Sequence, residues 1–340
     1  MTEGYNECPS WEQVWDGRRP EHSSWSEPGE WRHGWQFYAA AQRDKHYREC
    51  ALLPVLDTGS AAFFRSQAGR ASVAHLTALP VDRATTLQPH HLRVLLLRRL
   101  RLELPLGLRR CKCGKPVDPL GDHFASCATV GKLALRAVPV ERMWARVCRE
   151  AGARVLQNCL LKDLNLEGLT EDDERRIEVI ATGLPLFGGT QLAVDATLVS
   201  AVKADGSPQP QAAKKDGARL AEARRRKERK YPELLEARRC KLVVAAMEVG
   251  GRWSEEAWTF LKLLAHAKAR SSPTLMRRST EYCLLRRWSS MLAVAAQAAF
   301  AGTLLGEKPG KLELSDNWGV DWGELLHDRE VAADGPSRLL

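Results

Sequence analysis

The spacing of apolar residues divides the first third of the chain into a part without a regular pattern and a part with one. Residues 1–35 mix tryptophan, proline, glycine and charges with neither a helical nor a strand period, so we expect an irregular, Trp-rich leader there. Across residues 36–110 apolar positions recur mainly at helical spacing, most clearly in HHLRVLLLRRLRLEL at residues 90–104. This second segment is expected to be mostly helical.

After the first third, the pattern alternates between helical and strand periods. Residues 133–151 have an amphipathic helical pattern, and residues 218–239 have a strongly charged one that is interrupted near Pro232. Runs rich in β-branched residues predict four strands, at 154–161, 176–181, 191–200 and 241–249. The predicted order αβββαβ gives an α+β fold over residues 131–252. It is the order of the restriction-endonuclease-like core, although order alone does not determine a fold.

The C-terminal part is expected to consist of helices and a polar tail. Ser254 is a preferred N-cap residue, so we predict helices over 253–306 and a loosely attached tail over 307–340. The longest apolar run, 291–305, is interrupted by Gln297 and is too short to cross a membrane. The N-terminus lacks the basic and apolar regions of a signal peptide. These features favour an intracellular protein without a membrane partner.

Three cysteines and one histidine occur within seventeen residues, in the run RCKCGKPVDPLGDHFASC. Their number and type are those of a closed, tetrahedral zinc site, and the glycines and prolines between them allow the chain to turn back. We predict a structural zinc knuckle at residues 111–130 that performs no chemistry itself, with the ligands Cys111, Cys113, His123 and Cys127. The adjacent His90 and His91 have no partners at ligand spacing, and we expect them to cap a helix or to face solvent.

Positive charge is concentrated in one segment of a chain whose formal net charge is +9. Between Lys214 and Lys241 there are twelve Lys or Arg residues and five Asp or Glu residues. Such a segment favours a polyanionic partner, and a solvated basic helix face is the alternative. The candidate nucleic-acid-binding residues are Arg224, Arg225, Arg226, Lys227 and Lys230.

Acidic residues interrupt three of the predicted strands. Asp195 lies between Val194 and Ala196 in an apolar run, and Glu178 lies in the preceding strand. If these strands form a hairpin, both carboxylates can face one side and hold Mg²⁺ or Mn²⁺ for phosphodiester hydrolysis, and a nearby lysine completes such a site. The alternative is that the acids face solvent at strand edges.

Two further acids are weaker candidates for this chemistry. Glu248 is a third candidate in the last strand, although it would equally suit a cap of the following turn. Glu141 is expected to be an exposed carboxylate on the first helix of the core.

Several stretches resemble a known family. RCKCGKPVDPLGDHFASC, DDERRIEVIATGLPLFGGTQLAVDATLVSA and YPELLEARRCKLVVAAMEVGGRWSEEA resemble the C-terminal region of site-specific non-LTR retrotransposon polyproteins. They are most similar to retroelement-derived reading frames of dinoflagellates. In this family a Cys-Cys-His-Cys knuckle is followed by a restriction-like endonuclease domain. The resemblance covers roughly residues 34–305, and the aromatic-x-Asp-Asp box of a reverse transcriptase is absent from the sequence.

The resemblance implies roles for particular residues. The first family acid falls on Glu178 and the second on Asp195, while the Lys-rich element before a tyrosine falls on Lys227 and Lys230. The chain departs from the pattern in two places. Ile177 stands where the family often has proline, and Thr197 stands where the general nuclease pattern has lysine. Lys227 or Lys230 is expected to supply the missing positive charge.

The function implied by this reasoning is metal-dependent nicking of DNA by a domain derived from a retrotransposon. Structural zinc and catalytic Mg²⁺ or Mn²⁺ are the implied cofactors, DNA or alternatively RNA is the implied partner, and the nucleus is the implied location. Two other hypotheses remain open from the sequence: an inactive nucleic-acid-binding module, and a retroelement remnant without function.

Overall fold

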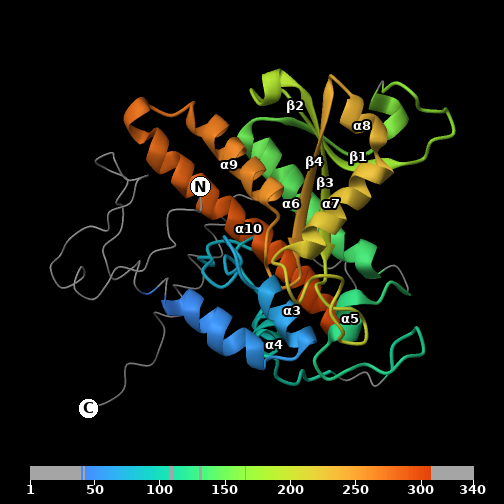
Figure 1. Ribbon diagram of the computed structural model, residues 1–340. Coiled ribbons are helices and arrows are strands. Elements are labelled where there is room, and N and C mark those ends of the chain that lie inside the picture. Colours follow the sequence, from blue (N-terminus) through green and yellow to red (C-terminus); the bar gives the residue numbers. More distant parts are fainter. Residues whose placement is uncertain (1–39, 41–42, 107–109, 130–131, 165, 308–340) are drawn as a thin grey trace, which may run out of the picture. The chain divides into compact units, whose positions relative to one another are not determined.

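The computed structural model describes residues 40, 43–106, 110–129, 132–164 and 166–307 (Figure 1). The predicted leader 1–35 and nearly all of the predicted tail lie outside these residues. The chain divides into two compact units, Met1–Ala61 and Ala62–Leu340. In the described part of the first unit, a π-helical turn, Tyr47–Leu52, leads into a 3-10 turn, Leu53–Val55. Helix α3 spans Thr58–Ser66. All further description concerns the second unit.

A four-stranded mixed sheet forms the centre of this unit. Its strands are β1 (Arg154–Leu160), β2 (Arg176–Thr182), β3 (Gln191–Val199) and β4 (Cys240–Glu248). They lie in the order β1-β2-β3-β4, with two antiparallel pairings followed by a parallel one between β3 and β4. Helix α6 (Lys132–Ala151) precedes β1, and α7 (Ala218–Lys230) connects β3 to β4. The predicted αβββαβ order and the α+β class are therefore confirmed.

Helices cover both faces of the sheet, because each strand carries apolar residues on both of its sides. One core contains Val194 and Ala245 together with residues of α6, α9 (Glu255–Ala269) and α10 (Arg277–Leu305). The other contains Ala193 and Val244 together with residues of α7 and of the short helix α8 (Pro232–Glu236). Alternate residues of one strand thus enter different cores. Figure 1 shows the resulting layers, with α6, α9 and α10 on one side of the strands and α7 and α8 on the other.

The helix boundaries follow local rules where the sequence contains a clear signal. Ser254 accepts a hydrogen bond from the Ala257 backbone N–H at 3.1 Å and caps α9, as predicted. The charged helix stops at Tyr231 because Pro232 cannot donate the hydrogen bond that would continue it.

Helix α4 (Pro89–Arg99) is shorter than the helical pattern at residues 90–104 suggests. The backbone of Arg101 has a φ of 56°, in the left-handed region, and this ends the helix. The side chain of Arg101 there reaches Asp122, so a tertiary contact accompanies the early end.

Helix α10 extends the predicted apolar run toward its N-terminus. By length and composition alone Thr274–Leu305 is long and apolar enough to cross a membrane, so the expectation that no segment qualifies is wrong. Most of its apolar window is buried against other described elements, as in the core helix of a folded domain. Gln297, which interrupts the run, is buried and donates a hydrogen bond to the Val249 carbonyl at 3.1 Å.

Strands β2 and β3 are hydrogen-bonded neighbours over a short length only. Their pairing covers three residue pairs and ends at Val179 and Val194. Glu178 and Asp195 come next on the two strands. β3 pairs with β4 along its whole length, but after Val194 its other edge has no neighbour among the described strands. The two acids therefore lie where β2 and β3 separate, a place called the fork below.

Candidate functional site

Glu178 and Asp195 share one ammonium group at the fork. Lys227 Nζ, which comes from α7, lies 2.5 Å from Asp195 Oδ2 and 3.8 Å from Glu178 Oε1. Both carboxylates therefore point to the same region, as the hairpin hypothesis requires. Lys227 thus brings a positive charge to the two acids from α7.

The three side chains are withdrawn from solvent but keep unused hydrogen-bonding capacity. The exposed side-chain fraction is 0% for Asp195, 19% for Glu178 and 12% for Lys227. Asp195 Oδ1 and Glu178 Oε2 are buried, and neither accepts a hydrogen bond from another of the described residues. Buried carboxylate oxygens without donors are costly, and a bound divalent cation would satisfy both. The donor set thus fits a hard cation.

Glu141 joins this group from α6, where we expected an exposed carboxylate. It is half-buried and lines the same cavity as Glu178 and Lys227. Burial, reinforced by the negative charge of Asp195, raises the pKa of Glu141 to about 7. The same two causes raise the pKa of Glu178 to about 8, and the ammonium of Lys227 opposes them. Three carboxyl groups share one lysine at this point, so Glu141 and Glu178 hold their protons to a higher pH than free carboxyl groups do.

Two other candidate residues lie apart from this group. Lys230 makes no ion pair within the described residues, and its ammonium lies 4.6 Å from the centre of the Tyr231 ring. Glu248 is four positions beyond the β4 partner of Asp195, at the far end of the sheet edge. Its carboxylate lies 3.8 Å from Arg252. Of the two lysines that the sequence left open, the structure brings Lys227 to the acids.

Tyr231 supports this arrangement from the end of α7. It is fully buried, and its hydroxyl donates a hydrogen bond to the Arg176 carbonyl at 2.9 Å. Burial and the nearby charges of Asp195 and Glu178 raise the pKa of the Tyr231 hydroxyl. The hydroxyl therefore stays protonated and fixes the end of α7 against β2.

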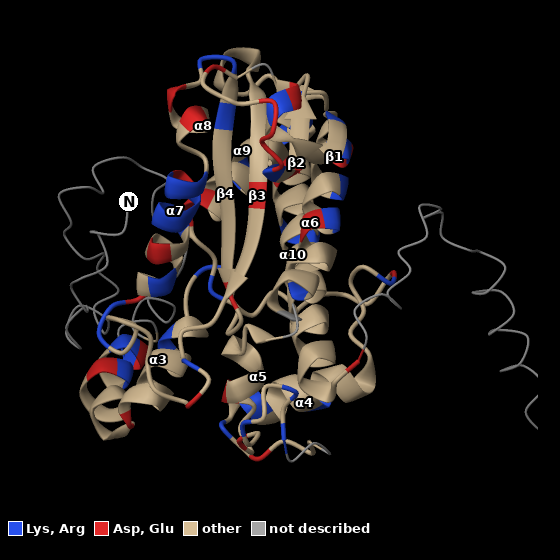
Figure 2. Ribbon diagram, turned by 90° about the vertical axis from the view of Figure 1, so that its right-hand side faces the viewer, with Lys and Arg blue, Asp and Glu red and all other residues tan. Residues whose placement is uncertain are grey.

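The basic residues of α7 differ in how far they are already paired. Figure 2 shows Lys and Arg gathered on this helix beside strands that are mostly uncharged. Arg224 pairs with Glu228 at 2.8 Å, and Arg225 pairs with Glu222 at 2.8 Å. Arg226 makes no ion pair within the described residues and lines the cavity. The three arginines of the predicted basic cluster thus divide into two that are paired with glutamates and one, Arg226, that is available to an anion.

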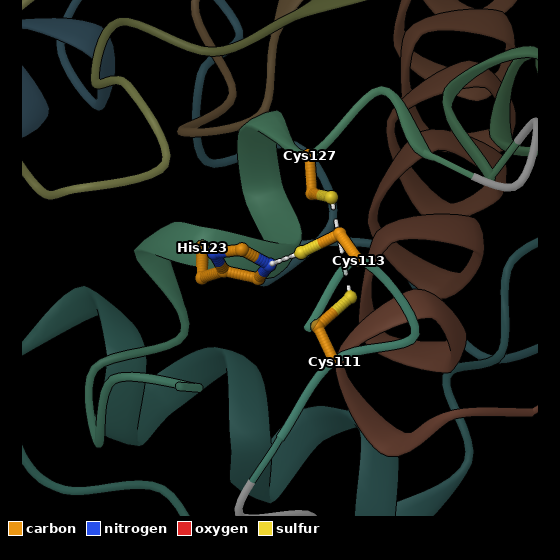
Figure 3. Close-up of side chains that lie close together, drawn as sticks. All are labelled: Cys111, Cys113, His123 and Cys127. Carbon is orange, nitrogen blue, oxygen red and sulfur yellow. Dashed lines mark hydrogen bonds between the residues drawn. The ribbon is translucent and has the colours of Figure 1, made fainter. Parts of the chain in front are cut away.

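The predicted knuckle residues do converge (Figure 3). The Cys111 and Cys127 sulfurs are 4.0 Å apart, and the Cys113 sulfur is 3.3 Å from His123 Nε2. All four ligand atoms lie within 4.8 Å of one another. A Zn–S bond of about 2.3 Å places two sulfur ligands of a tetrahedral ion roughly 3.8 Å apart. The cluster can therefore hold a metal ion such as zinc.

A buried ion-pair network fixes the knuckle to the rest of the unit. Asp122, beside the ligand His123, accepts hydrogen bonds from Arg98 and Arg101 of the α4 end, each at 2.9 Å. Asp122 and Arg98 are both 2% exposed. The Arg98 guanidinium also lies 5.2 Å from the centre of the Phe300 ring of α10. The metal cluster is thus joined through one residue to two helices.

The two adjacent histidines find a partner far along the chain. His90 Nε2 is 3.1 Å and His91 Nε2 is 2.8 Å from the carboxylate of Glu307. His91 is buried, so the expectation that both rings cap a helix or face solvent is wrong for this residue. A contact between residues more than two hundred positions apart leaves no pattern along the chain.

Sequence reasoning missed two charged residues that the structure brings to the cavity, Arg136 and Arg219, and it underrated Glu141. Glu141 and Arg136 lie in a helix whose pattern does not reveal which polar residues face the sheet fork, and Arg219 lies before the basic cluster. Arg136 has one signal in the sequence, because Leu133 and Val140 lie at core spacing on either side of it.

Comparison with known proteins adds no family to this description. No protein-family model matches the chain, and no curated protein matches it.

Proposed function

We propose that this chain is a metal-dependent DNA endonuclease that nicks one strand, with a restriction-endonuclease-like core. The observation that supports it best is the group at the fork, where Glu178 and Asp195 share Lys227 and each carries a buried oxygen without a donor. Paired carboxylates beside a lysine in a cavity are the arrangement that phosphodiester hydrolysis with a divalent cation needs.

Each residue has a role that follows from its position. Asp195, fully buried and rigidly held on a central strand, is the fixed ligand for Mg²⁺ or Mn²⁺, with Glu178 beside it. Glu141 completes the set from α6. Bound there, the cation would polarise the phosphodiester and lower the pKa of an attacking water. Lys227 holds Asp195 in place and offers positive charge to the oxygen on which negative charge develops.

We further propose that the cluster of Cys111, Cys113, His123 and Cys127 holds zinc with a structural role. The cluster has four protein ligands and hence no open position for substrate. Its connection through Asp122 to α4 favours a part in stability and in shaping the protein beside the cavity.

Nicking of supercoiled DNA tests the proposed activity. The wild-type protein is expected to convert supercoiled to open-circular DNA with Mg²⁺ or Mn²⁺. Asp195→Asn should reduce the rate by about 100-fold or more, because it removes a charged ligand while keeping the side-chain shape. Glu256→Gln is the matched control, since Glu256 pairs with Arg224 outside the cavity. It should nick at the wild-type rate.

The same assay separates the other hypotheses. An inactive binding module has one specific observation in its favour, because the Lys227–Asp195 pair at 2.5 Å already satisfies one oxygen of the acid without a cation. If Asp195→Asn nicks DNA as fast as the wild type, or if folded wild-type protein does not nick at all, the endonuclease proposal is wrong. If the protein then binds DNA but does not nick it, the binding-module hypothesis is favoured. If it neither binds nor nicks DNA, the hypothesis of a remnant without function is favoured.

A further inference from the structure

The cavity beside the fork is lined by both acidic and basic side chains. Its volume is about 330 Å³, at the small end of the range for ligand sites. The acids are Glu141 and Glu178, and the arginines are Arg136, Arg219 and Arg226. The carboxylates account for a cation, but they do not account for the three arginines. A second ligand, of negative charge, would explain them.

Arg136 is the most unusual of these arginines. It is 1% exposed, and within the described residues it makes no ion pair with a carboxylate. Its guanidinium donates instead to the carbonyls of Ala125 and Leu198, at 3.1 and 3.3 Å. Burial lowers the pKa of Arg136 to about 10, so the side chain still carries its charge at neutral pH. The guanidinium also lies 5.5 Å from the centre of the Phe300 ring. A buried positive charge with only neutral partners favours an anion nearby.

The two arginines from α7 add uncompensated charge at the rim. Arg219 is half-buried and Arg226 is exposed, and neither makes an ion pair within the described residues. Burial, followed by repulsion from Arg226, lowers the pKa of Arg219. The two arginines lie seven positions apart on α7, so they face the same side of the helix, and an anion bound there would offset their mutual repulsion. Arg224 and Arg225 on the same helix, by contrast, already have glutamate partners.

We propose that Arg219 and Arg226, backed by the buried charge of Arg136, bind a second backbone phosphate of DNA, next to the phosphate at the carboxylates. This inference rests on the proposed function, because it names the part of the substrate that the arginines receive. Guanidinium groups match phosphate oxygens in geometry and charge.

The salt dependence of DNA binding tests the assignment. The full-length protein is titrated with a short DNA duplex in buffer without Mg²⁺ or Mn²⁺ and without chelator, so that cleavage is prevented and zinc is retained. Arg219→Gln and Arg226→Gln should each weaken binding and reduce the slope of log affinity against log salt by about 0.9, the value for one lost phosphate contact. Thermal unfolding of each variant checks that it is folded.

Arg225→Gln is the matched control, since its side chain neighbours Arg226 in sequence but pairs with Glu222. It should leave the slope unchanged. The assignment is wrong if Arg219→Gln and Arg226→Gln both keep the wild-type salt slope. It is also wrong if Arg225→Gln reduces the salt slope by the same amount as they do.

Asp195→Asn separates this inference from the proposed function. It should lose nicking but keep the wild-type salt slope, because the carboxylate contacts a cation and not a phosphate. If nicking follows the predictions while the arginine slopes do not change, the phosphate site alone is wrong. If the slopes change as predicted and no metal supports nicking, the phosphate site stands and the endonuclease proposal is wrong.

Discussion

At the residue scale, the central feature is a carboxylate that is fully buried in an otherwise apolar strand. Asp195 is 0% exposed, and desolvation of such a charge costs several kcal/mol. Lys227 offsets part of this cost at 2.5 Å, but one carboxylate oxygen has no donor. Replacement by an apolar residue would be cheaper for stability alone. The arrangement is therefore better explained by a ligand than by folding.

Glu248 is a buried acid outside the site, and it predicts a dependence of stability on pH. Arg252, Asp216 and Arg219 are the charged groups around it. Burial raises its pKa from 4.5 to about 7, with Asp216 adding to the rise and the two arginines opposing it. The folded state therefore keeps the proton to a higher pH than the unfolded state does. Its contribution to stability is complete below about pH 4.5 and is lost as pH rises toward 7.

Glu248→Gln should remove this dependence. Each pH unit in that window lowers the wild-type free energy of unfolding by about 1.4 kcal/mol through this group. Glu248→Gln cannot titrate at this position, so its free energy of unfolding does not fall in this way. The difference in free energy of unfolding, variant minus wild type, should therefore rise by up to about 3 kcal/mol between pH 4.5 and pH 7. Urea unfolding of both proteins at a series of pH values measures the difference. A difference that stays constant across the series would contradict the prediction.

At the element scale, a few backbone hydrogen bonds position the ligands of the knuckle. The segment contains the short helix α5 (Asp122–Ser126). The Asp118 carboxylate accepts hydrogen bonds from the backbone N–H groups of Asp122 and His123 at 3.0 and 2.6 Å. These bonds turn the ligand His123 toward the sulfurs. Asp122 then joins the knuckle to α4. A bound metal would stabilise the knuckle and the packing of α4 and α10 together.

Zinc content and thermal stability test this arrangement. Purified protein should contain one zinc ion per chain, because one four-ligand cluster was identified among the described residues. Cys127→Ser should lose most of the zinc and lower the melting temperature, since metal-binding energy in such sites contributes to folding. Elemental analysis and thermal unfolding measure the two effects. Cys283→Ser, at an exposed cysteine outside the cluster, should change neither; equal loss in both variants would argue against the zinc site.

At the scale of the whole unit, close backbone contacts hold elements together that are far apart in sequence. Gly250, in the turn after β4, packs against Ser66 at the end of α3, and the Arg252 N–H donates to the Ser66 carbonyl at 2.9 Å. Phe63 of α3 lies near the Arg98 guanidinium, 4.7 Å from ring centre to charge. The end of α3 thus meets both the sheet and the helix that supports the knuckle.

Gly250→Ala should destabilise the fold through this contact. An added Cβ would overlap Ser66 Oγ and come within 2.7 Å of the Ser66 backbone, which cannot move as a flexible side chain can. We expect a loss of about 1–3 kcal/mol in the free energy of unfolding, measured with urea. Gly302→Ala in α10 is the control, because its Cβ would meet the end of the Glu307 side chain at 3.2 Å, where a small shift suffices, and not a fixed backbone. It should hold or raise stability, as alanine favours helix by about 1 kcal/mol. If Gly250→Ala leaves the free energy of unfolding unchanged, the turn can move enough to accept the added Cβ, and the prediction is wrong.

The sequence by itself determined what depends on neighbouring residues along the chain. The order of helices and strands follows from local periodicity, the cap at Ser254 and the stop at Pro232 follow from backbone hydrogen bonding, and the four knuckle ligands are recognisable because they lie within seventeen residues. The acid at Asp195 is conspicuous in its strand for the same reason.

Only the tertiary structure decided which charges meet. Lys227 and Lys230 are three positions apart on one helix, and the packing of α7 on the sheet turns the first toward the acids and leaves the second beside Tyr231. The neighbouring Arg225 and Arg226 also face different surroundings, since Arg225 pairs with Glu222 and Arg226 lines the cavity. Glu141 and Arg136 enter the cavity because β2 and β3 diverge and α6 lies beside the gap. A helix fixes the angle between its side chains, but the direction of each face is set by the elements that pack against it.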